Sequence, residues 1–191
     1  MIKIVFAYAK SCYYPKPRYA FGLDGGLPWP HHPIDLKMFR EVTDGCVMVM
    51  SKGTFESLPK LLPNRKHYVL TNNKKDAVSD VKCRSGEHPH ELLYCQLKDY
   101  LDDFIVVAKL DQLISEDVCV IGGPKLITGV MPIADEVHAT KISGAYKSDV
   151  EINLSKLKEY KKSGYFELID KQVIRSSEYP KLTKYVYRAT E

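Results

Sequence analysis

Residues 27–40 read LPWPHHPIDLKMFR, and the second half of this stretch predicts the opening of a helix. Pro33 suits the first helical position, because its missing N–H would have no intrahelical partner there. Asp35 follows in the first turn, where the helix dipole favours a negative charge. Helical spacing puts Asp35 on one face with Leu36 and Phe39, among apolar groups. A dipole partner on a surface helix would explain Asp35 alone, but a carboxylate in apolar surroundings is costly unless something binds it.

The composition fits one ordinary globular domain, which we expect to span residues 1–191, with 45% hydrophobic and 27% charged residues. The net charge of +4 suits an anionic small ligand, and no Lys/Arg block supports nucleic-acid binding. Five scattered cysteines without a CxxC pair indicate reduced thiols and no metal site. The first apolar run is too short for a signal peptide or a membrane span. We therefore expect a cytoplasmic protein (host cytoplasm if viral) that does not bind membranes.

Short apolar runs alternate with helical patterns, and this alternation predicts an α/β protein with a mainly parallel sheet. The expected strands are 2–9, 46–50, 67–71, 105–108, 118–121 and 136–142, followed by an antiparallel hairpin of 165–174 and 182–187. The expected helices begin near 33 and 55 and also cover 89–103, 110–115 and 126–131. Residues 11–19 read as an irregular loop, and the glycine-rich stretch 21–27 as a mobile cover or a plain surface turn.

Two strand ends carry small residues and a lysine. Gly122-Gly123 follows one buried strand and precedes Lys125, and 51–54 (SKGT) follows another. Together they fit a dinucleotide lying across the carboxyl edge of a parallel sheet, and either lysine could neutralise a 2′-phosphate. No GxGxxG follows the first strand, and no GxSxG or metal-ligand spacing occurs, so other nucleotide and hydrolase signatures are absent.

In this order the motifs closely resemble those of dihydrofolate reductases, above all the longer phage enzymes. They are Leu27-Pro28-Trp29, Asp35-Leu36 with Phe39, Thr54-Phe55-Glu56-Ser57, 61–65 (LLPNR) and Val120-Ile121-Gly122-Gly123. The resemblance implies a three-layer α/β/α fold with an antiparallel C-terminal hairpin. It also implies NADPH-dependent reduction of dihydrofolate to tetrahydrofolate, in support of thymidylate and one-carbon metabolism, by a monomer or homodimer.

The same resemblance assigns roles position by position. Asp35 would hold the pterin and assist protonation of its N5, with Leu27 and Trp29 on a loop over the reacting atoms. Arg65 would bind the glutamate α-carboxylate, Thr140 would hydrogen-bond Asp35, and Asp149 would brace the loop. The implied substrate contacts are Val5, Ala7, Asp35, Leu36, Phe39, Leu58, Leu62, Arg65, Ile121 and Thr140. The implied cofactor contacts are Ala7, Phe21, Gly22, Leu27, Ser51, Lys52, Gly53, Thr54, Leu70, Thr71, Asn72, Ile121, Gly122, Gly123, Pro124, Lys125 and Leu126.

Some positions depart from the family pattern, and other functions compete with it. Ser51 stands where the family usually has glycine, Ile127 where an aromatic residue is frequent, and the loop at His31-His32 is one residue longer. A related reductase, such as a riboflavin-pathway pyrimidine reductase, would not need Asp35 together with Arg65. A non-catalytic nucleotide-binding or virion protein would not need to keep Asp35 and Trp29. The stretches 11–19 and 72–103 suggest no role.

Overall fold

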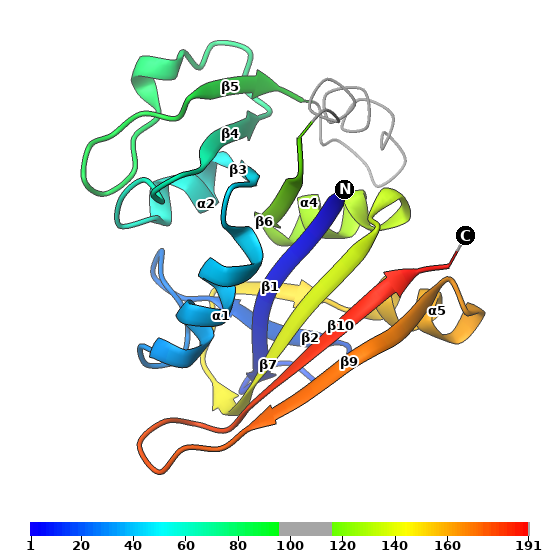
Figure 1. The fold of residues 1–191 in the computed structure, drawn as a ribbon. Coiled ribbons are helices and arrows are strands. Elements are labelled where there is room, and N and C mark those ends of the chain that lie inside the picture. Colours follow the sequence, from blue (N-terminus) through cyan, green and yellow to red (C-terminus); the bar gives the residue numbers. More distant parts are fainter. Residues whose placement is uncertain (96–115, 191) are drawn as a thin grey trace.

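The computed structural model describes residues 1–95 and 116–190, which build one twisted sheet flanked by helices (Figure 1). The strands lie in the order β5-β4-β3-β6-β1-β7-β10-β9, and β2 pairs with β1 and β8. Their bounds are β1 Ile2–Ser11, β2 Arg18–Gly22, β3 Val47–Ser51, β4 Lys66–Thr71, β5 Glu91–Tyr94, β6 Val118–Gly122, β7 Glu136–Tyr146, β8 Val150–Asn153, β9 Phe166–Ile174 and β10 Leu182–Ala189. The helical elements are α1 Pro33–Thr43, α2 Lys52–Ser57, η1 Val78–Asp80, α4 Pro124–Val130, η2 Met131–Ile133 and α5 Ser155–Ser163.

The strands from β5 to β7 pair in parallel, whereas β10 runs antiparallel to β7 and to β9. The predicted sheet, with its antiparallel C-terminal hairpin, is therefore confirmed. Strands β3 and β6 consist almost wholly of buried apolar residues, because helices cover both faces of a parallel sheet.

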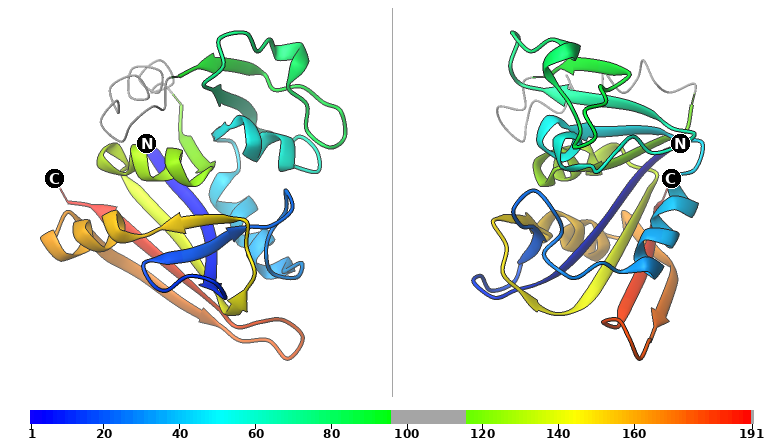
Figure 2. Two further views of the ribbon diagram at one scale, coloured as in Figure 1. Left: turned by 180° about the vertical axis from the view of Figure 1, so that it is seen from behind. Right: turned by 90° about the vertical axis from the view of Figure 1, so that its left-hand side faces the viewer.

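The two faces of the sheet pack against different helices, which makes the fold three-layered (Figure 2). On one face, Ile4 and Val120 join Leu126 of α4 and Leu157 of α5 in one apolar cluster. On the other face a second cluster holds Val5, Met48 and Ile121, together with Phe55 of α2 and Phe39 of α1. The connection through α1 leads from β1 to β3, and the connection through α4 leads back past β1 to β7. Such crossovers are right-handed, so two connections that run in opposite directions along the sheet place their helices on opposite faces.

Helix α1 spans the predicted range, and local chemistry explains both of its ends. Pro33 occupies the first turn, and the ring of His32 caps it, with Nδ1 accepting the Asp35 N–H at 3.4 Å. The other ring nitrogen of His32 lies 2.8 Å from the carbonyl oxygen of Pro180 in the β9–β10 turn, so a donated N–H there fixes the start of the helix against the hairpin. The helix ends at Thr43, before Asp44 and Gly45.

Two predictions about secondary structure were wrong. The helix expected over 89–103 is, where described, the strand β5, paired in parallel with β4 from Tyr68↔Glu91 to Thr71↔Tyr94. An apolar pair such as Leu92-Leu93 fits either period, and the free edge of β4 decides the outcome. The loop expected over 11–19 ends in β2, because Tyr19 is buried and pairs with β1.

Some elements of the structure were not predicted, and some predictions fall on residues that the structure does not describe. Strand β8 and helix α5 received no assignment from the sequence. The expected strand 105–108, the helix 110–115 and the second half of the helix 89–103 lie outside the described residues. Within residues 1–95 and 116–190, no helix is long and apolar enough to cross a membrane.

Candidate active site

A cavity of about 1070 Å³ lies where β1 and β6 part beside α1. The two strands pair from Ile2↔Val118 to Ile4↔Val120 and no further, so Val5 and Ile121 stand at a gap in the ladder. Both residues line the cavity. From β1 the chain passes β6 to reach β3, and from β6 it passes β1 to reach β7, so the two connections run in opposite directions. The gap between β1 and β6 is therefore a topological switch point, the usual ligand site of open α/β sheets.

Asp35 supplies a buried carboxylate to the wall of this cavity. Its residue is 7% exposed, and it lies among Val5, Leu36 and Phe39 on an otherwise mostly apolar wall. Burial raises the pKa of Asp35 to about 6, although the nearby His32 ring acts to lower it. Thr140 lines the same cavity, but the predicted Asp35–Thr140 hydrogen bond does not form among the described residues. The carboxyl group can therefore hold or release a proton near neutral pH.

Arg65 stands at another part of the cavity wall and is held rigidly by main-chain carbonyls. Its Nε donates to the Thr43 oxygen at 2.9 Å, and its two terminal nitrogens donate to the oxygens of Pro63 at 2.8 Å and Arg40 at 2.9 Å. Its side chain is only 4% exposed, and Asp44 lies 3.6 Å away. A guanidinium has five N–H donors, so two are left for a ligand, as a bidentate carboxylate requires.

The glycine-rich stretch forms a tight turn that borders the cavity. Leu23 and Gly26 exchange two main-chain hydrogen bonds, and Asp24 and Gly25 between them have φ of 50° and 68°. Positive φ at both central residues is typical of a two-residue hairpin turn. Asp149 braces this turn: its carboxylate accepts the Asp24 N–H at 2.9 Å, and its own N–H donates to the Gly22 oxygen at 3.1 Å.

The strand ends of β3 and β6 meet at the other side of the cavity. The Gly123 N–H donates to the hydroxyl of Ser51 at 2.9 Å, and that hydroxyl lies 3.2 Å from the hydroxyl of Thr54. A Cβ atom on Gly122 would come within 2.9 Å of the Thr54 hydroxyl, so only glycine fits there. Ser51, found where the family usually has glycine, thus contributes a hydrogen bond that ties the two strand ends together.

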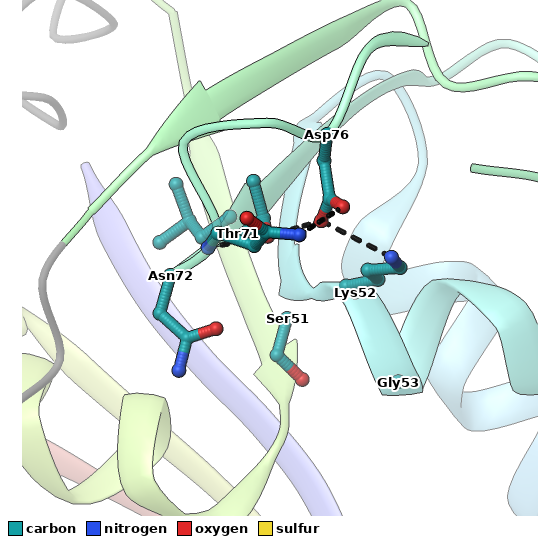
Figure 3. Close-up of a pocket in the computed structure, with 8 residues that line it drawn as sticks. Ser51, Lys52, Gly53, Thr71, Asn72 and Asp76 are labelled. Carbon is teal, nitrogen blue, oxygen red and sulfur yellow. Dashed lines mark hydrogen bonds and ion pairs between the residues drawn. The ribbon is translucent and has the colours of Figure 1, made fainter. Parts of the chain in front are cut away.

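A second cavity, of about 260 Å³, continues past Ser51 and Gly53 to the ends of β3 and β4 (Figure 3). Lys52 and Asp76 form an ion pair in it, with 3.1 Å between Nζ and Oδ2, and the Thr71 hydroxyl donates to the same oxygen at 2.6 Å. On this side of the site, the ammonium group of Lys52 is therefore already paired with the carboxylate of Asp76.

Most of the predicted contact residues line one of the two cavities. All ten predicted substrate contacts line the larger one, as do Leu27, Phe21, Gly22, Ser51, Gly53, Thr54, Gly123 and Pro124. Lys52, Leu70, Thr71 and Asn72 line the smaller one. In the described part of the chain, no group of three or more His, Cys, Asp or Glu side chains is arranged to hold a metal ion.

Four predicted site residues line neither cavity. Trp29 is 4% exposed and packs with Ala9, Ile142 and Leu182, because its large ring fills the space beside α1. Its buried Nε1–H has no hydrogen-bond partner within the described residues. Leu126 faces the core, Lys125 is exposed to solvent, and Gly122 is covered by Thr54 and Phe21.

Sequence reasoning missed two polar residues of the smaller cavity, Asn73 and Asp76. Both follow β4 in a stretch where no hydrophobic period indicates structure. The available signal was their position directly after a strand that ends in Thr71.

The fold and the site together define a class of protein. A mainly parallel sheet with a large cavity at its switch point and a buried carboxylate in the cavity wall is typical of α/β enzymes that act on small molecules with a nucleotide. The family model described as "Dihydrofolate reductase" matches residues 2–178. The chain belongs to the dihydrofolate reductase family.

Individual relatives agree with this assignment. The chain is 35% identical to a dihydrofolate reductase of Bacillus subtilis over 128 residues, which are 67% of this chain and 65% of that protein. It is 31% identical to a Staphylococcus aureus dihydrofolate reductase over 67% of each chain. Among solved structures, dihydrofolate reductase from Enterococcus faecalis complexed with NADP(H) and RAB-propyl matches with a TM-score of 0.67. That match has 23% identity and covers 100% of this chain and 97% of the other, so it shows a shared fold.

Proposed function

We propose that the chain catalyses the NADPH-dependent reduction of 7,8-dihydrofolate to 5,6,7,8-tetrahydrofolate, consuming one proton. The observation that carries this proposal is Asp35, a single carboxylate buried in a mostly apolar cavity with a pKa raised to about 6. Reduction of an imine carbon becomes easier once its nitrogen is protonated, so a proton-holding group near neutral pH suits this reaction.

The residues at the strand ends fit a dinucleotide. Ser51 and Gly53 line both cavities, so the two form one continuous site. Ser51, Lys52 and Thr71 would hold the cofactor there, and Ala7 and Ile121 would border its reactive end. When bound, NADPH supplies the hydride for C6 of the pterin.

Two sets of groups would orient the substrate. Asp35 would accept hydrogen bonds from N3 and the 2-amino group of the pterin, and the main-chain oxygens of Val5 and Ile121 would accept another donor where β1 and β6 part. Arg65 would bind a carboxylate of the glutamate tail with its two remaining donors. Because hydride transfer requires the two rings to be held in the right geometry, a rigidly held Arg65 would contribute by orienting the substrate.

The buried Trp29 N–H supports a further part of this proposal. A buried donor without a partner costs free energy unless a water molecule or ligand accepts a hydrogen bond from it. Ile34 and Met38 of α1, the helix that carries Asp35, pack against the apolar cluster that contains Trp29. We therefore assign Trp29 to hold a water molecule near the carboxylate rather than to contact the substrate itself.

Single-turnover hydride transfer, measured against pH for the wild type and Asp35→Asn, tests the proposal. The variant keeps the cavity's shape and should bind NADPH normally, and its rate at neutral pH should fall by about 10²–10⁴-fold. Solvent can still protonate the substrate, so the variant's rate should rise as the pH is lowered and approach that of the wild type. A variant as fast as the wild type at pH 7 would refute this mechanism.

Titration of the purified protein with NADPH and methotrexate separates this function from its alternatives. Tight binding of both together with turnover of dihydrofolate supports a dihydrofolate reductase. Turnover of a ribitylamino- or ribosylaminopyrimidine instead would indicate the related reductase, and binding without turnover would indicate a non-catalytic relative. We further propose that the protein acts in the cytoplasm and is a monomer or homodimer. Light scattering on the purified protein distinguishes the two oligomeric states.

A further inference from the structure

The smaller cavity contains a carboxylate that binds the very group expected to recognise a cofactor phosphate. Asp76 Oδ2 accepts from Lys52 Nζ at 3.1 Å and from the Thr71 hydroxyl at 2.6 Å, and its Oδ1 accepts from the Asn73 amide at 2.7 Å. The Asp76 side chain is only 9% exposed, and that of Lys52 is 34% exposed. The carboxylate is thus fixed by donors from the end of β4, the turn after it and the start of α2.

The charges in this network stabilise one another. The hydrogen bond to Asp76 raises the pKa of Lys52, and the hydrogen bonds from Thr71 and Lys52 lower the pKa of Asp76. In Figure 3, Lys52 and Thr71 both point toward Asp76, whereas the side chain of Asn72 points away from it. The charged form of Lys52 is therefore favoured, but its charge is already compensated by Asp76.

The position of this network determines which part of a dinucleotide meets it, and this step rests on the proposed function. Neighbouring strands end in the order β1, β6, β3, β4, and a dinucleotide extends along such a row of carboxyl ends. With the nicotinamide near Asp35, at the gap between β1 and β6, the adenosine ribose lies beside β3 and β4. An acidic side chain at this point suits a ribose 2′-hydroxyl, and a free cation suits a 2′-phosphate.

We propose that Asp76 is a specificity-determining residue: its carboxylate occupies Lys52 and opposes a 2′-phosphate, and so lowers the preference for NADPH over NADH. A 2′-phosphate reaches Lys52 only by displacing Asp76 or by lying beside it as a like charge. A 2′-hydroxyl, in contrast, can donate to the carboxylate as it stands. The chain accordingly accepts both cofactors more evenly than Lys52 alone would dictate.

Equilibrium binding measures this effect without turnover. Dissociation constants for NADPH and NADH are obtained from the quenching of Trp29, the single tryptophan, in the wild type and in Asp76→Asn. Asparagine keeps an acceptor oxygen for Thr71 and removes the charge, so NADPH should bind about tenfold more tightly relative to NADH than in the wild type. Adenosine 2′,5′-bisphosphate compared with AMP should show the same change, because these fragments report on the adenosine end alone.

Matched variants exclude a general charge effect and a folding defect. Glu56→Gln removes the same charge near Lys52, but in the described chain Glu56 has no hydrogen bond to Lys52, so the cofactor ratio should change less than twofold. Asp76→Glu restores the charge and should return the ratio toward that of the wild type. Should Asp76→Asn fail to fold in a thermal melt, Asp76→Ala takes its place with the same expected direction.

Each outcome has a definite consequence. Equal changes for NADPH and NADH, weaker NADPH binding by Asp76→Asn, or an unchanged fragment ratio would overturn the role of Asp76 while leaving the proposed reductase function intact. A wild-type protein that binds neither dinucleotide would overturn both.

Discussion

Asp35 shows how one side chain can link stability to function. Its carboxylate is surrounded by apolar groups, and burial is the largest influence on its pKa, so the folded chain binds the proton more tightly than the unfolded chain does. The free energy of unfolding therefore contains a contribution that is fully present below the unfolded pKa of 3.8 and is lost as the pH rises through about 6. A group kept for folding alone would not be placed in this way.

We expect Asp35→Asn to be more stable than the wild type at pH 7. A rise in pKa of about two units corresponds to roughly 3 kcal/mol, and the neutral amide does not carry this cost. The difference in unfolding free energy between variant and wild type should grow between pH 4 and pH 6 and then level off. Urea unfolding at a series of pH values measures it, and a difference independent of pH would show that Asp35 titrates normally.

Arg65 allows a prediction about ligand selectivity. Its hydrogen bonds to main-chain oxygens fix the guanidinium, so its two remaining donors can bind a carboxylate with charge-assisted bonds worth roughly 1.5–3 kcal/mol. Arg65→Leu should weaken methotrexate by about that amount and should affect trimethoprim, which has no carboxylate, far less. Arg65→Lys serves as the control that keeps the charge without the planar fork. Equal losses for both inhibitors would mean that Arg65 mainly connects α1 to the loop before β4.

The turn of residues 23–26 depends on Asp149 for its position. Asp149→Ala removes the acceptor of the Asp24 N–H, so the turn and the adjacent Leu27 should be held less firmly at the border of the cavity. We expect hydride transfer to slow by about ten- to a hundredfold, because positioning errors of this kind are costly. Asp149→Asn keeps an acceptor oxygen and should lose much less. Stopped-flow measurements of hydride transfer test this, and a similar loss of rate in both variants would contradict the bracing role of Asp149.

Helices and strands of this fold differ in whether the sequence alone predicts them. Helix α1 was predicted because its signals are local: Pro33 suits the first position, Asp35 suits the first turn, and Gly45 follows soon after the last turn. Strand β5 was not, because its pairing with β4 depends on a partner more than twenty residues away. Asp76 belongs to this second kind: nothing near it in the sequence indicates that it meets Lys52. Local signals thus singled out Asp35, and the other expected substrate contacts came from the family resemblance. The contact between Asp76 and Lys52 became visible only in the folded chain.

Residues of β1, α1, β6 and β7 line the larger cavity, so a ligand bound in it should stabilise the entire fold. A ligand at a hundred times its dissociation constant adds about 2.7 kcal/mol to the free energy of unfolding. For a chain of this size that corresponds to a rise in melting temperature of roughly 5–10 °C. We expect this rise with methotrexate and, separately, with NADPH in differential scanning calorimetry.

The binding of methotrexate and that of NADPH should depend on different residues, so variants should change the two rises in melting temperature separately. At one fixed methotrexate concentration, Arg65→Leu should lose most of the shift, because its dissociation constant rises, but it should keep the shift caused by NADPH. Val150 and Leu62 border the same cavity from distant parts of the chain, so stabilisation should appear as one cooperative transition and not as a separate shoulder. A methotrexate shift that survives in Arg65→Leu, or a second transition that the ligand leaves unmoved, would contradict a single cavity shared by the whole fold.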